Sequence, residues 1–515
     1  PPHAPRQHSA ACAGLKLLPS ICPQHSLSSP QAPVLVMMGR VGSLSPAHVA
    51  GAGMGQMYTN LTGLALIYAL GFGCQGLFSQ AFGAKDYDRL SLLLKRLLVL
   101  RLVCALAVTL PLWLGAGRLL LLAGMPRDVV RLTQTFVLWR LPALPCLILR
   151  NDLTNFLLAQ RVTLRPTAIN TTVNFAVLLA LPLCMDSLGL GFAGAALAFT
   201  LKDMAQGSLL LALGSRWVHA GAWPTWRSGW RAAASGWLEL AALGVPSAVM
   251  MWGEWFAWEF NLFLAGALCE GGAACPAIEA YPILSNTMVL GFMVQFGFAM
   301  AAGTRTGNAF GAGRGGDARF TAGVALALVT SISAAVAAVL VAMRHQWAGW
   351  FLAGDPAGDV SRLVAESLPW VAAYIVGDTL GPGWAHTLLW SLGTPLVKPA
   401  ALVVFAFWVV GVPLGCILAF QRGLGLLGLW IGLATGMWVH GGGLVAYVYC
   451  CGGVTWSRVG PATSVLEPPL EGVEEGESSA GPTPAEGKDA VLPRARGLPG
   501  GVETGLTTAP AGLEC

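Results

Sequence analysis

One four-residue sequence occurs twice in this chain, and the repeat constrains the fold more than any other feature. Ala81-Phe82-Gly83-Ala84 returns as Ala309-Phe310-Gly311-Ala312, an offset of 228 residues. Three weaker matches follow in the same order, at offsets of 231, 233 and 234 residues: 128–132 with 359–363, 165–166 with 398–399, and 191–194 with 425–428. Four collinear matches at nearly constant spacing indicate a duplicated half.

The composition indicates that lipid surrounds most of the chain. Of its 515 residues, 55% are hydrophobic and only 11% are charged, whereas soluble domains carry about 25% charged residues. Apolar runs long enough to cross a bilayer recur between short polar or Gly/Pro turns. Eleven spans are expected, at 52–78, 98–122, 134–158, 167–186, 191–213, 239–266, 278–302, 321–343, 365–390, 397–420 and 425–450. A doubtful earlier run, 33–41, is too short to cross.

The repeat and the spans predict an all-α polytopic membrane protein. Twelve transmembrane helices, the first truncated or atypical, would form two pseudo-symmetric six-helix bundles around a central cleft. The expected parts are a disordered or atypical N-terminus (1–32), an N-terminal lobe (33–214), an inter-lobe linker (215–236), a C-terminal lobe (237–452) and a disordered cytoplasmic tail (453–515). Because the sequence does not open with Met and shows no signal-peptide pattern, we expect its start to be artificial or wrongly assigned.

Basic residues gather in alternate loops, which predicts the orientation. Lys85, Arg161, Arg216, Arg305 and Lys398 belong to the more basic set, which the positive-inside rule places in the cytoplasm. The net charge of +5 therefore needs no nucleic-acid partner. We expect a monomer in the lipid bilayer of the plasma or vacuolar membrane.

Counting the doubtful run as the first, the seventh span (239–266) carries the densest cluster of residues that suit transport. Charged side chains inside a span cost about 2.5–3.5 kcal/mol on insertion scales and therefore mark functional sites. Helical spacing stacks Glu254 with Trp258, and Trp255 with Glu259. A carboxylate beside an indole suits an organic cation, and the same carboxyl group could exchange a proton for that cation. The alternative is that one glutamate only bonds to a neighbouring helix.

Other polar residues in the spans are weaker candidates. Asp378 lies in the Gly/Pro-rich tenth span, Glu279 and Asn286 in the eighth, and Asn60 in the N-terminal lobe, where hydrogen bonding between helices is the alternative. Arg150 and Asp152 lie in the fourth span without a clear role. Cys269 and Cys275 flank a loop expected outside, where a disulfide is one alternative and two free thiols the other.

Several stretches resemble the multidrug and toxic compound extrusion family in its eukaryotic form, over about residues 39–450. They are 60–63, 80–84, 131–135, 142–145, 157–160, 240–247, 254–255 and 305–313. The resemblance implies twelve helices in two bundles and efflux of organic cations or metabolites against inward proton or sodium flux. Glu254 and Glu259 match the family's acidic motif of the seventh helix, and Asp378 that of the tenth.

At two further positions, this chain carries a different residue from some members of the family. Asn286 falls where some relatives carry a glutamate. Val34 stands where many bacterial members carry an aspartate, so the mechanism attributed to that residue is not transferred here.

These features predict a secondary active antiporter that exports organic cations, xenobiotics or secondary metabolites in exchange for protons by alternating access. Glu254, Glu259 and Asp378 are expected to line its cleft, and Na⁺ is the alternative coupling ion. The sequence shows no P-loop, metal-ligand spacing or nucleophile–base set, so we expect no cofactor, no bound metal and no enzymatic activity.

Two alternative functions remain at this level. One is a flippase-type transporter of lipid-linked or amphipathic substrates with the same fold. It would need basic residues in the cleft, whereas the spans offer mainly carboxylates and aromatic residues. The other is a non-transporting membrane receptor, which does not explain the duplication.

Overall fold

The computed structural model describes residues 46–122, 125, 127–219, 221–227, 229–268, 275–351, 358–450, 454 and 456. These residues belong to a unit that extends to Leu466. The expected N-terminal segment (1–32), the doubtful span at 33–41, Val34 and Cys269 lie outside the described residues, as does nearly all of the expected tail.

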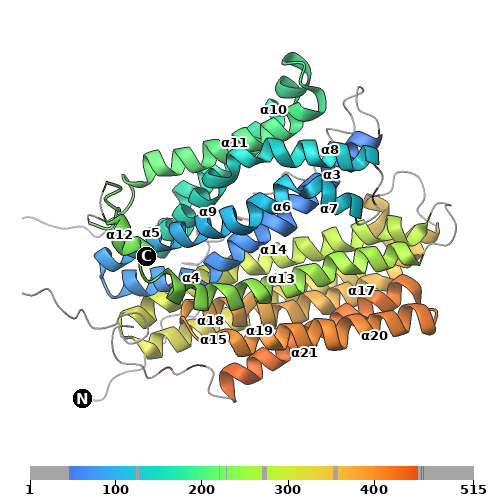
Figure 1. The fold of residues 1–515 in the computed structure, drawn as a ribbon. Helices are drawn as coiled ribbons and strands as arrows, with labels where there is room; N and C mark the ends of the chain where they lie inside the picture. The colour runs from blue at the N-terminus through green and yellow to red at the C-terminus, as the bar shows by residue number, and fades with distance from the viewer. Residues whose placement is uncertain are drawn as a thin grey trace, which may run out of the picture. The chain divides into compact units, whose positions relative to one another are not determined.

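The described residues of the first half form five long helical segments (Figure 1). The first joins α3 (Pro46–Thr59), η2 (Asn60–Leu64) and α4 (Ala65–Gly83), and the second joins α5 (Tyr87–Cys104), η3 (Ala105–Thr109) and α6 (Leu110–Leu114). After the short α7 (Ala116–Leu122) come α8 (Arg127–Arg140), η4 (Leu141–Ala143) and α9 (Leu144–Ala159), then α10 (Leu164–Pro182) with η5 (Leu183–Ser187), and α11 (Gly191–Gly214). The short α12 (Trp230–Ala234) lies within the expected linker.

Within the part of the second half that the structure describes, there are six long segments (Figure 1). They begin with α13 (Trp237–Ala267), α14 (Pro276–Gly311) and α15 (Gly315–Ala342), followed by the short α16 (Arg344–Trp347) and η6 (Ala348–Trp350). The fourth joins α17 (Asp359–Leu380), η7 (Gly381–His386) and α18 (Thr387–Ser391). The last two are α19 (Val397–Val404) with η8 (Phe405–Gly411), α20 (Val412–Cys416) and η9 (Ile417–Gln421), and α21 (Gly425–Tyr449).

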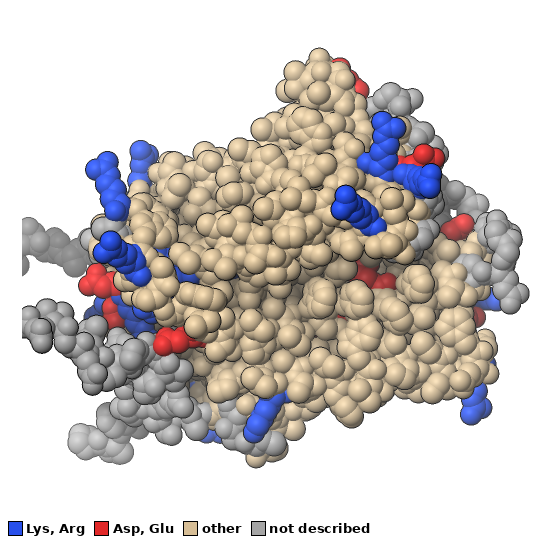
Figure 2. All heavy atoms as spheres, in the orientation of Figure 1, with Lys and Arg blue, Asp and Glu red and all other residues tan. Residues whose placement is uncertain are grey.

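Each of the eleven expected spans overlaps one of these segments, so the prediction of an all-α membrane fold is confirmed. Nine helices of the described residues are long and apolar enough to cross a membrane. The other two long segments are α13, which carries Glu254 and Glu259, and α17–α18, which carries Asp378. Figure 2 shows Lys and Arg gathered toward the ends of the helices, with largely uncharged surface between them.

The duplicated sequence is matched by a duplicated turn. Gly189 and Gly191 precede α11 with φ angles of 64° and 50°, and Gly423 and Gly425 precede α21 with φ angles of 68° and 55°. Glycine adopts such positive φ angles without steric cost. The two turns lie 234 residues apart, the offset of the fourth sequence match, which supports the duplication in backbone geometry as well as in sequence.

The repeated Ala-Phe-Gly-Ala sequence lies where the two halves touch. It ends α4 and α14, which pack against each other. A Cβ atom on Gly83 would meet the backbone of Asn308, and a Cβ atom on Gly311 would meet the backbone of Gln80. This reciprocal contact explains why both copies need a glycine at the third position.

We expect Gly311→Ala to lower the melting temperature of the detergent-solubilised chain, because overpacking a tight contact costs about 1–3 kcal/mol. Gly316→Ala is the matched control, since a Cβ atom there meets nothing within 4 Å. Thermal unfolding followed by tryptophan fluorescence measures both. Equal melting temperatures for the two variants would show that the α4–α14 contact tolerates a side chain.

Candidate functional site

A cavity of about 350 Å³ lies between helices of both halves. This volume falls within the range of small-molecule binding sites. The N-terminal half contributes polar residues, chiefly Gln56, Asn60, Tyr68, Arg140, Arg150, Asn151, Thr154, Asn155, Asn170, Lys202 and Asp203. The C-terminal half contributes Trp255, Trp258 and Glu259 from α13, and Val289, Phe292 and Met293 from α14.

The C-terminal wall combines aromatic rings with one carboxyl group. The rings of Trp255 and Trp258 stack with centroids 6.4 Å apart, and Phe292 meets Trp258 edge-on at 6.2 Å. Glu259 is half-buried in the same wall. Because indole faces attract cations and Glu259 supplies opposite charge, this wall suits an organic cation.

Glu254 and Asp378 do not line the cavity, so the expectation that they share it with Glu259 is wrong. Both are buried, with relative exposures of 1%. Glu254 and Glu259 are five residues apart on α13, which turns their side chains roughly 140° away from each other. Glu254 therefore faces the interior of the C-terminal half while Glu259 faces the cavity.

A chain of hydrogen bonds links the aromatic wall to the buried carboxyl groups. Trp258 Nε1 donates to the Tyr374 hydroxyl over 2.5 Å, and that hydroxyl lies 3.4 Å from its acceptor, Glu254 Oε1. Asp378 lies four residues after Tyr374 on the same face of α17 and interacts electrostatically with Glu254. A side chain of the cavity wall is thus connected to the acidic pair in two steps.

Neutral polar groups surround Asp378. Gln295 Nε2 donates to its carboxylate, and Ser333 Oγ donates to Gln295 Oε1 over 2.7 Å. No Lys or Arg of the described residues forms an ion pair with Glu254 or Asp378. Buried charges without a counter-ion are costly. This pair is therefore suited to holding a proton or a small cation.

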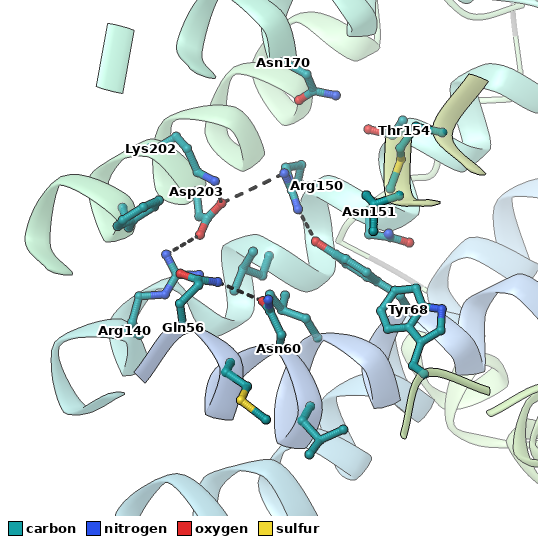
Figure 3. A pocket seen from close by; sticks show the side chains of 18 of the residues that line it. Gln56, Asn60, Tyr68, Arg140, Arg150, Asn151, Thr154, Asn170, Lys202 and Asp203 are labelled. Atoms are coloured by element: carbon teal, nitrogen blue, oxygen red, sulfur yellow. Dashed lines mark hydrogen bonds and ion pairs between the residues drawn. The ribbon is translucent and has the colours of Figure 1, made fainter. Parts of the chain in front are cut away.

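The N-terminal wall carries three basic side chains around one carboxylate (Figure 3). Arg140 Nη1 lies 2.9 Å from Asp203 Oδ2, Lys202 Nζ lies 3.0 Å from Asp203 Oδ1, and Arg150 Nη1 lies 4.0 Å from Oδ1. Arg150 also donates to Gln206 Oε1 over 2.9 Å and to the Tyr68 hydroxyl.

The basic wall corrects the view that the spans offer the cleft mainly carboxylates and aromatic residues. The signal was present in the sequence, because Lys202 and Asp203 interrupt the apolar run 191–213. The rule that singled out Glu254, namely that ionisable residues inside a span mark functional sites, selects these two residues as well.

The structure separates Arg150 from Asp152. Arg150 faces the cavity, whereas Asp152 is fully buried and pairs with Arg101 of α5. Arg101 also donates to Asn151 Oδ1 over 2.9 Å. Residues two apart on a helix face different sides, which accounts for the two separate roles.

The other candidates divide between the cavity and the surface. Asn60 lines the cavity and accepts a hydrogen bond from Gln56 Nε2 over 2.8 Å. Glu279, in the first turn of α14, and Asn286 are both exposed, and neither lines the cavity. Cys275 is disulfide-bonded.

Comparison with known proteins identifies the family. The family model described as MatE matches residues 33–185 and 239–417, one block in each half of the chain. The chain is 31% identical over 380 residues to multidrug and toxin extrusion protein 1 of Rattus norvegicus, covering 73% of this chain and 64% of that protein. It is 30% identical over 419 residues to protein DETOXIFICATION 51 of Arabidopsis thaliana, covering 80% of this chain and 75% of that protein.

Solved structures agree on the fold. A crystal structure of the eukaryotic MATE transporter AtDTX14 aligns with a TM-score of 0.76 and 22% sequence identity, covering 87% of this chain and 98% of the other. The alignment with the rat protein covers less than two thirds of that protein's length. The two matched blocks, the duplicated helices and the apolar spans lead to one conclusion: the chain is an integral membrane protein that belongs to the MatE family.

Proposed function

We propose that this chain is a secondary active antiporter that exports organic cations, xenobiotics or secondary metabolites in exchange for protons. One observation carries the proposal. A cavity wall of two indoles and a carboxyl group is hydrogen-bonded through Trp258 and Tyr374 to a buried acidic pair. The names of the rat and Arabidopsis relatives, which refer to extrusion and detoxification, agree with it.

In this proposal, the cation and the proton bind at different carboxyl groups, and a hydrogen-bonded link couples the two events. The cation binds at Glu259 between the indoles, and its arrival changes the hydrogen bond from Trp258 to Tyr374. Glu254 and Asp378 then release a proton on the side to which the cavity opens, and rocking of the two halves exposes the cavity to the other side. With one-for-one exchange, each pH unit across the membrane sustains a tenfold cation gradient, about 1.4 kcal/mol.

The proposal includes the setting of the protein. We place it as a monomer in the plasma or vacuolar membrane, and it needs no cofactor and no nucleic-acid partner. H⁺ is the proposed coupling ion, with Na⁺ as the alternative at the acidic pair.

Uptake into proteoliposomes tests this function. An acidic interior is expected to drive uptake of radiolabelled tetraethylammonium, and a sodium gradient alone is not. Glu259→Gln should lower the initial rate at least tenfold, because the aromatic wall of the cavity loses its carboxylate. Glu279→Gln is the control, since Glu279 is exposed and lies outside the cavity. If the chain is correctly folded but moves no cation under either gradient, the proposal is contradicted.

The basic wall favours a second candidate function, transport of a lipid-linked or amphipathic anion. Arg140, Arg150 and Lys202 supply the positive charge that a phosphate group requires. Translocation of a fluorescent phospholipid in the same vesicles, without proton-driven cation uptake, would favour this alternative.

A further inference from the structure

We propose that the inter-lobe linker (215–236) carries a surface that binds anionic phospholipid headgroups of the cytoplasmic leaflet. This linker surface consists of Arg227 and Arg231 with the indole of Trp230, which lies next to Arg231 in the sequence. None of the three residues lines the cavity. The inference therefore concerns a second place on the molecule and does not depend on the proposed transport function.

The charge of the linker is the first argument. The segment contains Arg216, Arg227 and Arg231 but no aspartate or glutamate. All three arginines are exposed, and none of them forms an ion pair with an acidic side chain of the described residues. The positive charge of the linker is therefore available to a partner outside the chain.

Basic side chains of α5 add to this charge. The short α12 packs against α5, and Arg96 Nε donates to the carbonyl oxygen of Ala232 over 3.4 Å. A Cβ atom on Gly229, midway between Arg227 and Arg231, would lie 3.2 Å from Lys95 Nζ. Like charges held together on a folded surface repel each other, and an anion beside them offsets that repulsion.

A row of aromatic rings leads from the interior to the linker surface. The ring of Trp223 meets buried Phe156 of α9 at 6.2 Å between centroids, and Trp226 follows Trp223 at 6.1 Å. Trp230 completes the row 6.2 Å from Trp226, and its Nε1 donates to the Trp226 carbonyl oxygen over 2.7 Å. Trp230 is 41% exposed. The row therefore fixes an exposed indole at the surface.

An exposed indole beside arginines favours a lipid surface over a soluble anion. Tryptophan is enriched at membrane–water interfaces, where its ring lies at the level of the headgroups. Lys and Arg side chains lie on the surface at the end of the molecule where α12 is labelled (Figure 1, Figure 2). The positive-inside rule assigns the linker, which contains Arg216, to the cytoplasm. The cytoplasmic leaflet carries anionic lipids, and each basic side chain near it gains about fivefold in affinity.

The competing explanation is that these arginines only set the orientation of the chain during insertion. Two lipids with identical acyl chains, phosphatidylglycerol and phosphatidylcholine, distinguish the two explanations. Native mass spectrometry of the purified full-length chain, titrated with each lipid, measures the affinities. We expect phosphatidylglycerol to bind at least tenfold more tightly. This comparison uses the unmodified chain and so does not depend on any variant folding.

Variants test the assigned residues. Arg227→Gln/Arg231→Gln is expected to weaken phosphatidylglycerol binding at least tenfold and to change phosphatidylcholine binding less than twofold, because only the anionic lipid loses attraction. Arg227→Lys/Arg231→Lys keeps the charges and should keep the preference. The matched control is Arg127→Gln/Arg131→Gln, which removes two exposed arginines of the same spacing from α8, in the less basic set of loops. This control should bind both lipids as the unmodified chain does.

Free glycerol 3-phosphate provides the last comparison, because it carries a phosphate without acyl chains. We expect it to displace no bound phosphatidylglycerol at a hundredfold excess, and displacement would overturn the lipid surface in favour of a soluble anion. Equal affinity of the unmodified chain for the two lipids would also overturn the proposal. So would a preference for phosphatidylglycerol that survives in Arg227→Gln/Arg231→Gln, or that is lost equally in the α8 control.

Discussion

Asp378→Asn and Glu254→Gln are each expected to reduce proton-driven cation uptake at least a hundredfold while the chain still folds. Both carboxyl groups are buried without a basic partner among the described residues, and each amide keeps the shape of the side chain but cannot take up or release a proton. Initial uptake rates in proteoliposomes with an acidic interior measure the effect.

Glu366→Gln is the control for this experiment. It lies on the same helix as Asp378, but its side chain is 50% exposed and pairs with Arg362 at the surface over 3.7 Å. Near-normal uptake by Asp378→Asn or Glu254→Gln would mean that proton coupling does not pass through the acidic pair. Loss of the melting transition in either variant would instead mean that its carboxyl group is needed for folding.

Asp152→Ala is expected to destabilise the chain by about 3–5 kcal/mol, because it leaves the guanidinium of Arg101 buried and without its partner. Both side chains of this pair are 0% exposed. The double variant Arg101→Met/Asp152→Leu should recover most of the loss, since it replaces both charges with apolar groups in a bundle that lipid surrounds. Chemical denaturation in mixed micelles measures the change in unfolding free energy.

An exposed pair provides the comparison. Arg314 and Asp317 also form an ion pair, at 3.0 Å, but their side chains are 58% and 63% exposed. Asp317→Ala should therefore cost less than about 1 kcal/mol. If Asp152→Ala cost no more than Asp317→Ala, Arg101 would have to be neutral or in contact with water once its partner is removed. That result would contradict a buried, charged ion pair.

The fold could be predicted because two independent patterns agree. Apolar runs of bilayer length set the helices, and the Ala-Phe-Gly-Ala repeat set their division into two halves. The same repeat then proves to be a contact, since Gly83 and Gly311 each lie against the other copy's helix. Local sequence could not show that contact, because it depends on how α4 and α14 cross.

The candidate site could be predicted only in part. Trp255, Trp258, Glu259 and Asn60 do line the cavity. Glu254 does not, because which face of α13 meets the cavity depends on how the helix is rotated in its bundle rather than on its own sequence. Lys202 and Asp203 stand out in the sequence as ionisable residues in a span, but the wall itself is assembled from α8, α9 and α11. Only packing brings Arg140, Arg150 and Lys202 to one carboxylate.

Proton release on cation binding tests the central claim most directly. The purified full-length chain in weakly buffered nanodiscs is mixed with tetraethylammonium, and a pH indicator records the protons that appear. Coupling between a cation at Glu259 and a proton at Glu254 and Asp378 predicts roughly one proton released per cation bound, and a smaller release for Glu259→Gln. Saturable cation binding that releases no proton between about pH 4 and 9, a range that spans ordinary and strongly perturbed carboxyl groups, would contradict proton antiport by this cavity.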